Sequence, residues 1–239
     1  MSIARARLDR FISEHCRISR RDVRLLLAQK RIKVDGKIID DIGYIIDKFS
    51  QITLDDRVLQ ANQPSYVMLH KPVGVVCATK DDKHTTVIDL LERADKHRLH
   101  IVGRLDLNTS GLVLLTNDSR WSQRLTSPEH KVEKRYQVTL KNPLTPDYID
   151  AFAQGMYFEF ENITTLPAQL TILSTYQAEV ILIEGRYHQI KRMFGRFRNQ
   201  VMALHRSAIG QLTLDESLNV GESRALTADE VSTIANASE

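Results

Sequence analysis

Asp106 lies in a polar stretch bounded by glycines that suits the placement of one reactive carboxylate. The stretch reads Gly103-Arg104-Leu105-Asp106-Leu107-Asn108-Thr109-Ser110-Gly111, and the apolar run 112–115 follows at once. A short apolar run of this kind predicts a strand buried on both faces, and a rigid strand is a good support for a reactive side chain. The pattern therefore predicts an acid held for catalysis. The alternative is an ordinary turn, because Asp, Asn and Ser also hydrogen-bond to nearby backbone.

Other reaction classes are disfavoured by the residues present. The sequence has no glycine-rich phosphate loop, and the spacing from Gly103 to Gly111 is not that of a dinucleotide fingerprint. The histidines are not at metal-ligand spacing, and residues 188–191 lack the Glu and the second His of a zinc-protease helix. We therefore expect no metal, no ATP or NAD and no other small-molecule cofactor.

The composition is that of a soluble globular protein. Its 239 residues are 42% hydrophobic and 26% charged, which suits one large domain or a small domain joined to a larger one. No stretch has the length of a signal peptide or a membrane span. Cys16 and Cys77 fall in different expected domains, which favours free thiols in a reducing compartment. We expect a cytoplasmic monomer with no membrane partner.

The positive charge is concentrated at the N-terminus. Residues 1–37 contain 11 Lys and Arg against 4 Asp and Glu, whereas the remainder contains 22 against 26. A local excess of this kind is typical of a surface that binds a polyanion, and RNA is the natural candidate.

Two short amphipathic helices and a hairpin are predicted within this basic segment. Apolar residues recur at i, i+3 and i+4 at positions 8, 11 and 12, and again at 23, 26 and 27. Ser19 and Asp22 have the spacing of a capping box that opens the second helix. The dipeptide Asp35-Gly36 between two apolar runs predicts a two-residue hairpin turn.

Residues 5–55 resemble the S4 domain, a small RNA-binding module. The resemblance rests on Arg7-Leu8-Asp9, Ser19-Arg20-Arg21 and Ile32-Lys33-Val34-Asp35-Gly36. It implies a module that grips structured RNA mainly through phosphates. The candidate contacts are Arg20, Arg21, Arg24 and Lys33. The alternative for these cations is a solvated charged face.

The rest of the chain predicts a larger α+β domain beyond a polar linker at 61–64. Strands are predicted at 66–69, 73–77, 112–116, 136–140, 168–173 and 178–183, and helices at 87–96, 120–125, 146–154 and 187–197. We therefore expect an S4-like domain over residues 1–60. Residues 65–239 are expected to form a catalytic domain with a mixed, largely antiparallel sheet.

The larger domain resembles the pseudouridine synthases of the branch named for the small-subunit enzyme. Lys71-Pro72-Val73-Gly74 matches the start of that domain and residues 103–116 match its catalytic motif. Glu133-Lys134-Arg135-Tyr136 matches the second motif, and residues 184–193 match the third. The resemblance implies isomerisation of uridine to pseudouridine in ribosomal RNA or a ribosomal assembly particle, with 16S rRNA the expected target.

The resemblance also assigns roles to particular side chains. Asp106 becomes the nucleophile or charge stabiliser at the sugar, and Tyr136 stacks on the uracil and assists the final deprotonation. Without the resemblance, Tyr136 would equally suit an aromatic core position. Lys191 matches the cation that pairs with the aspartate and favours its ionised form, and Arg192 beside it is the alternative partner.

Further RNA contacts are expected around the target base. A uridine inside folded RNA must be flipped out before its C1′ can meet an aspartate. Arg104 is placed to fill the gap or to hold a phosphate, and an ion pair within the protein is its alternative role. Arg186, His188 and Arg192 of the third motif are the other candidates.

Other functions fit part of the pattern. A noncatalytic ribosome assembly factor would keep the fold but would not need Asp106, Tyr136 and Lys191 together. A glycosidase or nucleosidase built on Asp106 lacks an evident second carboxylate. Arg135 and His70 replace the threonine and asparagine common in close relatives. Both bear on target choice, so 23S rRNA remains an alternative target.

Overall fold

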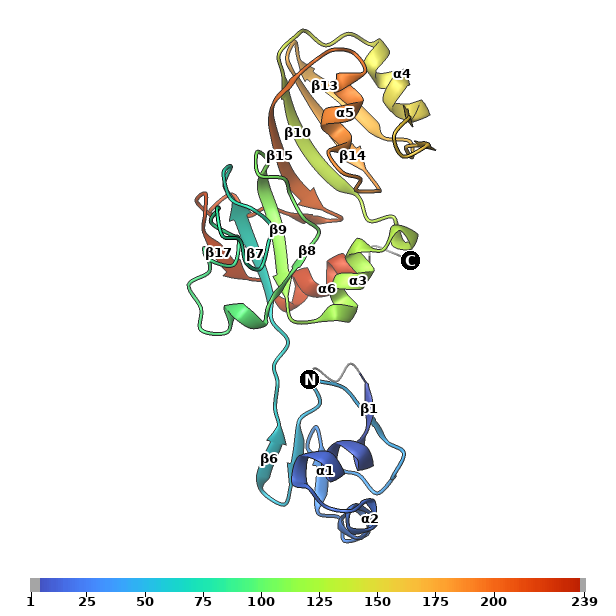
Figure 1. Cartoon of the computed structure of the whole chain (residues 1–239), viewed down its shortest axis with the longest axis vertical. Helices are drawn as coiled ribbons and strands as arrows, with labels where there is room; N and C mark the ends of the chain where they lie inside the picture. Colours follow the sequence, from blue (N-terminus) through green and yellow to red (C-terminus); the bar gives the residue numbers. More distant parts are fainter. Residues whose placement is uncertain (1–4, 237–239) are drawn as a thin grey trace. The chain divides into compact units, whose positions relative to one another are not determined.

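The computed structural model describes residues 5–236 and divides the chain into two compact units, residues 1–64 and 65–239 (Figure 1). The elements of the first unit are β1 (Ala6–Arg7), α1 (Leu8–Cys16), α2 (Arg20–Ala28), β2 (Ile32–Val34), β3 (Lys37–Ile38), β4 (Ile45–Ile46), β5 (Ile52–Leu54) and β6 (Arg57–Gln60). Four of these strands form a sheet in the order β3-β2-β5-β6. The apolar faces of both helices and of this sheet share one core.

The local signals in the first unit are confirmed. Both predicted helices are present as α1 and α2. The Ser19 hydroxyl accepts from the Asp22 amide at 3.2 Å, and the Asp22 carboxylate accepts from the Ser19 amide at 3.2 Å, which completes the capping box. Asp35 and Gly36 have φ of +50° and +77°, the sign that a type I′ hairpin turn requires at both positions.

The second unit is built on one large sheet. The strands of this unit are β7 (Tyr66–Lys71), β8 (His100–Val102), β9 (Ser110–Thr116), β10 (Lys134–Leu140), β11 (Tyr157–Phe158), β12 (Ile163–Thr164), β13 (Gln169–Ser174), β14 (Gln177–Leu182), β15 (Val201–Ile209), β16 (Leu212–Thr213) and β17 (Ser223–Ala225), and all but the β11–β12 pair belong to that sheet. Its helices are α3 (Ser119–Thr126), α4 (Asp147–Gln154), α5 (Gln189–Gly195) and α6 (Ala228–Asn236), with 3₁₀ turns at Lys96–Arg98 and Pro128–His130.

The main path of this nine-stranded sheet is β13-β14-β10-β15-β9-β7-β17, with β8 paired to β9 and β16 to β15. Its strands pair antiparallel except for β15 and β9, which run parallel. The expectation of a mixed, largely antiparallel sheet is therefore confirmed.

Strand β9 is buried on both faces, as its apolar run predicts. Leu112 and Leu114 join the core that includes Trp121 of α3, whereas Val113 and Leu115 join the larger core on the opposite face. Helices α4 and α5 lie against the part of the sheet formed by β10, β13 and β14 (Figure 1). The Asp106 loop leads directly into β9, so a rigid, dry strand anchors it.

Two sequence predictions are wrong. Residues 73–77 form a turn with one isolated bridge, Val76 to Thr86, because Pro72 and Gly74 at φ +85° break the extended run. Residues 87–96 form turns rather than a helix, and only Lys96–Arg98 is helical, as a 3₁₀ turn. Most of the apolar side chains that suggested regular structure are buried, among them Val75, Val87 and Ile88, but they reach the core from irregular backbone.

Gly111 is required where β9 and β15 meet. The two strands share only two residue pairs, His205 with Ser110 and Arg206 with Gly111. Gly111 has φ +111°, and a Cβ added there would lie 2.3 Å from the Arg206 carbonyl oxygen. Only glycine therefore allows this approach of the two backbones.

We predict that Gly111→Ala lowers the free energy of unfolding by more than about 2 kcal/mol, because it combines backbone strain with a steric clash. Urea unfolding followed by circular dichroism measures this change. Gly195→Ala is the control, since a Cβ at that position meets nothing within 4 Å. Equal stability of the two variants would contradict the assigned role of Gly111.

Candidate active site

A cleft of about 590 Å³ in the second unit brings together residues that are far apart in the sequence. It is lined by the loop that carries Asp106, by Tyr136 on β10, by Arg206 on β15 and by residues 182–191 before and within α5. The candidate site residues that line it are Arg104, Asp106, Tyr136, Arg186, His188 and Lys191. The catalytic motif and the second and third motifs therefore meet in one place.

Two nitrogen atoms face the Asp106 carboxylate. Its Oδ2 lies 3.3 Å from His188 Nε2 and 3.6 Å from Lys191 Nζ. The side chains of Asp106, His188 and Lys191 are 32%, 35% and 27% exposed, so the Asp106 carboxylate is open to a substrate from one side. A lysine, and a histidine when protonated, stabilise an ionised carboxylate at these distances.

Arg192 does not face Asp106. Its guanidinium forms a two-pronged ion pair with Glu161 and lies 3.7 Å over the Phe158 ring. The sequence leaves open whether Lys191 or Arg192 pairs with Asp106. In the structure the partner is Lys191. Arg192 holds the β11–β12 hairpin against α5.

The buried ammonium of Lys71 fixes the loop that carries Asp106. Its Nζ donates to the Thr109 carbonyl at 2.7 Å and to the Asp106 carbonyl at 3.2 Å, and it lies 3.5 Å from the Leu107 carbonyl. The Lys71 side chain is fully buried, and burial lowers its pKa, although Cys77 and Asp106 act in the opposite direction. Carbonyl dipoles thus solvate this cation in place of water.

Arg206 fixes the two ends of the same loop. Its Nε donates to the Leu112 carbonyl at 2.8 Å, and its Nη2 donates to the Gly103 carbonyl at 3.1 Å. Arg206 is only 1% exposed and lies opposite Tyr136 across the β10–β15 pair. Tyr136 is itself only 8% exposed and lines the cleft, so its ring forms part of the cleft wall and is held in place by the packing around it.

The third motif is organised by Glu184. The Glu184 carboxylate accepts from the Gln189 side chain at 2.6 Å and from Arg186 Nε at 2.8 Å. His188 follows with φ +50° and precedes the first turn of α5. Its ring stacks on that of Tyr187 with centroids 3.9 Å apart, and Tyr187 is 74% exposed. The motif thus presents a stacked aromatic pair beside Asp106.

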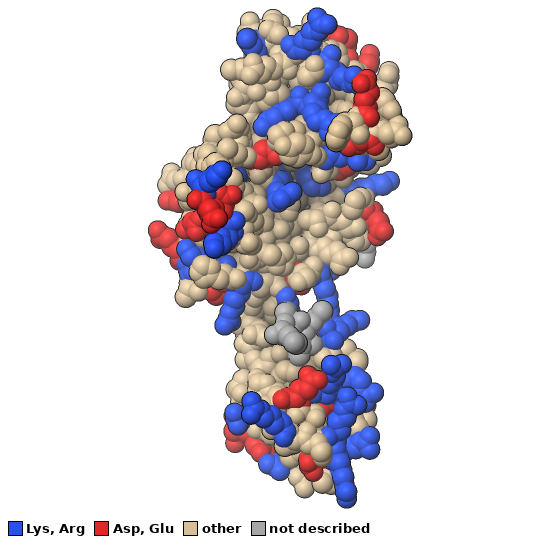
Figure 2. All heavy atoms as spheres, in the orientation of Figure 1, with Lys and Arg blue, Asp and Glu red and all other residues tan. Residues whose placement is uncertain are grey.

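The remaining candidates lie on surfaces. Arg104 is exposed at the cleft, and among residues 5–236 it has no carboxylate partner, so its alternative role in an ion pair is not found. Arg20, Arg21, Arg24 and Lys33 are exposed on α2 and β2 of the first unit. Figure 2 shows Lys and Arg side chains gathered along one side of that unit.

A family model described as RNA pseudouridylate synthase matches residues 65–195, and the S4 domain model matches residues 6–52. The chain belongs to the RNA pseudouridylate synthase family. Both resemblances found in the sequence are thereby confirmed. The matched region of this pseudouridylate synthase contains Lys71, Asp106, Tyr136 and Lys191.

Relatives of this pseudouridylate synthase match over nearly the whole chain. Ribosomal small subunit pseudouridine synthase A of Pseudomonas aeruginosa is 48% identical over 229 residues, which are 95% of this chain and 100% of that protein. The protein of the same name from Escherichia coli is 41% identical over 95% of this chain and 99% of its own length. A crystal structure of a pseudouridylate synthase aligns with a TM-score of 0.70 at 41% identity, covering 95% of this chain and 99% of that chain.

Among the described residues of this family member, no cluster of three or more His, Cys, Asp or Glu could hold a metal ion. No helix within residues 5–236 is long and apolar enough to cross a membrane. Cys16 and Cys77 are both free thiols, as the sequence predicts.

Sequence reasoning missed several residues that shape the cleft of this pseudouridylate synthase. The sequence marks Lys71 only as part of a motif and gives Arg206 no role, because a buried cation has no sequence signature beyond an unexpected charge in an apolar setting. Glu184 and Tyr187 lie within the third motif, but their roles depend on partners that only the fold supplies. Lys134 is a further example, since it lines the cleft and donates to the Val132 carbonyl at 2.8 Å.

The contribution of Lys134 to the free energy of unfolding depends on pH. Burial, aided by the charge of Arg206, lowers the pKa of Lys134 to about 8. An unfolded lysine titrates near about 10.4, so between these values the unfolded chain binds more protons and the group adds stability as the pH rises. We expect the free energy of unfolding of the wild type, relative to Lys134→Met, to increase from about pH 8 to about pH 10.

Urea unfolding of both proteins across this pH range measures the difference. Groups common to the two proteins cancel in the subtraction, so only Lys134 contributes to the trend. A difference that stays constant, or that falls with rising pH, would contradict the assignment.

Proposed function

We propose that this protein isomerises a uridine of small-subunit ribosomal RNA to pseudouridine. The observation that carries the proposal is the Asp106 carboxylate, held 3.3 Å from His188 and 3.6 Å from Lys191 in the cleft where all the motifs meet. The target RNA follows from the relatives, which carry the name ribosomal small subunit pseudouridine synthase A and match nearly the whole chain.

The reaction needs few catalytic groups. The bond from ribose C1′ to uracil N1 breaks, the base turns, and a bond forms from C1′ to C5, after which the C5 proton leaves and N1 gains one. A carboxylate stabilises the positive charge that develops at C1′, as in glycosidases, or bonds to the sugar carbon covalently. We assign this role to Asp106. The product has the composition of the substrate, so the reaction needs no oxidant, reductant or energy source.

The groups around Asp106 support the remaining steps. Lys191 and His188 border one side of the carboxylate, which leaves the exposed side for the sugar. The buried ring of Tyr136 offers a flat surface on which a uracil can stack during its rotation. We assign to its hydroxyl the removal of the C5 proton.

RNA binding is assigned to exposed cations in both units. Flipping the target base costs a few kcal/mol, which contacts to the flanking backbone must offset. Arg104 and Arg186 line the cleft and suit phosphate contacts there. In the first unit, Arg20, Arg21, Arg24 and Lys33 are exposed on adjacent elements of the S4 domain. We assign them phosphates of a structured rRNA segment.

We predict that Asp106→Asn lowers kcat by at least about 10³-fold, because the amide can neither attack C1′ nor stabilise its charge. The dissociation constant for RNA should stay within about threefold, since the side-chain shape is retained. Single-turnover tritium release from 5-³H-uridine in 16S rRNA, together with filter binding, measures both quantities.

Asp82→Asn is the matched control, because Asp82 is exposed on a loop of the same unit and does not line the cleft. It should retain full turnover. Undiminished turnover by Asp106→Asn would overturn the mechanism. RNA binding by the wild type without any turnover would favour a noncatalytic assembly factor.

A second prediction concerns the S4 domain. Replacement of Arg20, Arg21 and Arg24 by Gln should reduce the slope of log Kd against log salt by about two to three units, since each phosphate contact contributes about 0.7 to 0.9. Replacement of Lys80, Lys83 and Arg98 is the control, because these exposed residues carry the same total charge in the second unit. Equal slopes for the two triple variants would show that α2 does not contact phosphate.

A further inference from the structure

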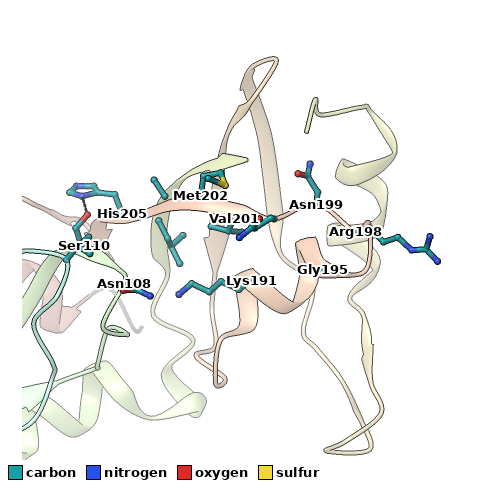
Figure 3. A pocket seen from close by; sticks show the side chains of 13 residues that line it. Asn108, Ser110, Lys191, Gly195, Arg198, Asn199, Val201, Met202 and His205 are labelled. Atoms are coloured by element: carbon teal, nitrogen blue, oxygen red, sulfur yellow. Dashed lines mark hydrogen bonds between the residues drawn. The ribbon is translucent and has the colours of Figure 1, made fainter. Parts of the chain in front are cut away.

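A second cavity, of about 750 Å³, lies beside the catalytic cleft, and of the residues that line it only Lys191 has a role in the chemistry described above. Its wall is formed by 13 residues from the loop after β7, the loop after Asp106, the end of α5 and the first half of β15 (Figure 3). It shares only Lys191 and Leu204 with the cleft. We refer to it as the β15 pocket. Because the β15 pocket lies close to Asp106, an RNA bound at Asp106 can also reach this pocket.

The chemistry of the β15 pocket suits a neutral ring with polar edges. None of the residues that line it is Asp or Glu. Val73 and Met202 supply apolar surface and are 58% and 60% exposed. Asn108 and Gln200 supply amide groups that both donate and accept. A planar, uncharged heterocycle with hydrogen-bonding groups at its rim matches this combination.

Cations contribute little to this pocket. Arg198 lines it, but its side chain is directed away from the interior in Figure 3. Lys191 is engaged with Asp106 at 3.6 Å. His205 donates to or accepts from the Ser110 hydroxyl at 3.0 Å, and burial lowers its pKa, so it is neutral near pH 7. A phosphate is therefore a poorer match than a nucleobase.

The first half of β15 adds an open strand edge. Val201, Ala203 and Leu204 pair with β10 on one side and Met202 lies in a bulge between them, whereas pairing with β9 begins only at His205. No strand among the described residues covers the other side of residues 201–204, and all four line the pocket. Backbone donors and acceptors are thus available along one wall. Such groups read the edge of a base without any side chain.

The pocket also connects to the catalytic loop. Asn108 is two residues beyond Asp106, and the Gly74 amide donates to the Leu107 carbonyl at 2.9 Å, which ties the Val73 loop to the catalytic loop. An RNA strand that places one nucleotide at Asp106 therefore has its neighbour within reach of this cavity.

We propose that the β15 pocket binds the nucleobase of a nucleotide next to the target uridine. The proposal rests on the RNA-modifying function proposed above and deepens it, because a base held here would select the sequence around the target. Unstacked bases beside a modified nucleotide are recognised by stacking on side chains and by hydrogen bonds to their edges. In this protein Met202 and Val73 provide the apolar surface, and Asn108, Gln200 and the β15 backbone provide the polar groups.

The test combines a protein variant with altered RNA. Met202→Glu places a negative charge in the pocket, and Leu173→Glu places the same charge on β13, where the side chain is 56% exposed and lies outside both cavities. Met202→Glu should raise KM for rRNA by about five- to 100-fold with kcat nearly unchanged, as expected for the loss of one bound base. Leu173→Glu should match the wild type, and the conservative Met202→Leu, which keeps an apolar side chain in the pocket, should restore most of the affinity that Met202→Glu loses.

Removal of one base at a time from the RNA identifies the nucleotide. In the wild type, an abasic site at one neighbour of the mapped target should raise KM by a similar factor, and Met202→Glu should then add almost nothing. Additive effects at every neighbouring position, or a KM unaffected by Met202→Glu, would overturn the proposal. A wild-type protein that forms no pseudouridine would instead refute the underlying function, so the two failures are distinguishable.

Discussion

The buried ammonium of Lys71 is the interaction on which the active-site geometry depends. The charged Nζ is fully buried and contacts only carbonyl oxygens, of which the Thr109 oxygen is the nearest at 2.7 Å. A charge without water is tolerated only where dipoles surround it closely. Asp106, Leu107 and Thr109 therefore keep their carbonyls turned inward, because with the loop turned away only the Pro72 carbonyl, at 2.8 Å, would solvate the ammonium.

Arg206 applies the same constraint to the two ends of the loop, through the Gly103 and Leu112 carbonyls. Its position follows from the parallel contact between β15 and β9, which Gly111 alone permits. The two cations thus hold the backbone of the loop, while the side chain of Asp106 is left facing outward. In the proposed mechanism, preorganisation of this kind lowers the barrier to reaction, since the carboxylate needs no rearrangement when the sugar arrives.

The sequence predicted those parts of the fold that are determined by residues close together in the chain. The capping box at Ser19, the turn at Asp35-Gly36 and the doubly buried β9 depend on neighbouring residues, and all three are confirmed. Strand β15 was not predicted, because its run contains His205 and Arg206 and its burial comes from β9 and β10. The segments 73–77 and 87–96 were assigned wrongly because apolar spacing reports burial and not hydrogen bonding. In the candidate site, the family resemblance paired Asp106 with Lys191, but the carbonyl contacts of Lys71 depend on tertiary structure.

His188 shows how local strain serves the site. A left-handed backbone at a residue other than glycine costs on the order of 1 kcal/mol or more, yet His188 adopts φ +50° at the start of α5. This backbone conformation directs the His188 ring so that it stacks on Tyr187, with centroids 3.9 Å apart, and its Nε2 reaches the Asp106 carboxylate. Lys191, on the first turn of α5, reaches the same carboxylate. Glu184 makes the arrangement persistent by binding both Arg186 and Gln189 on either side of the strained residue. The strained backbone of His188 and the buried Glu184 carboxylate therefore act together, and they set the direction from which His188 and Lys191 meet the Asp106 carboxylate.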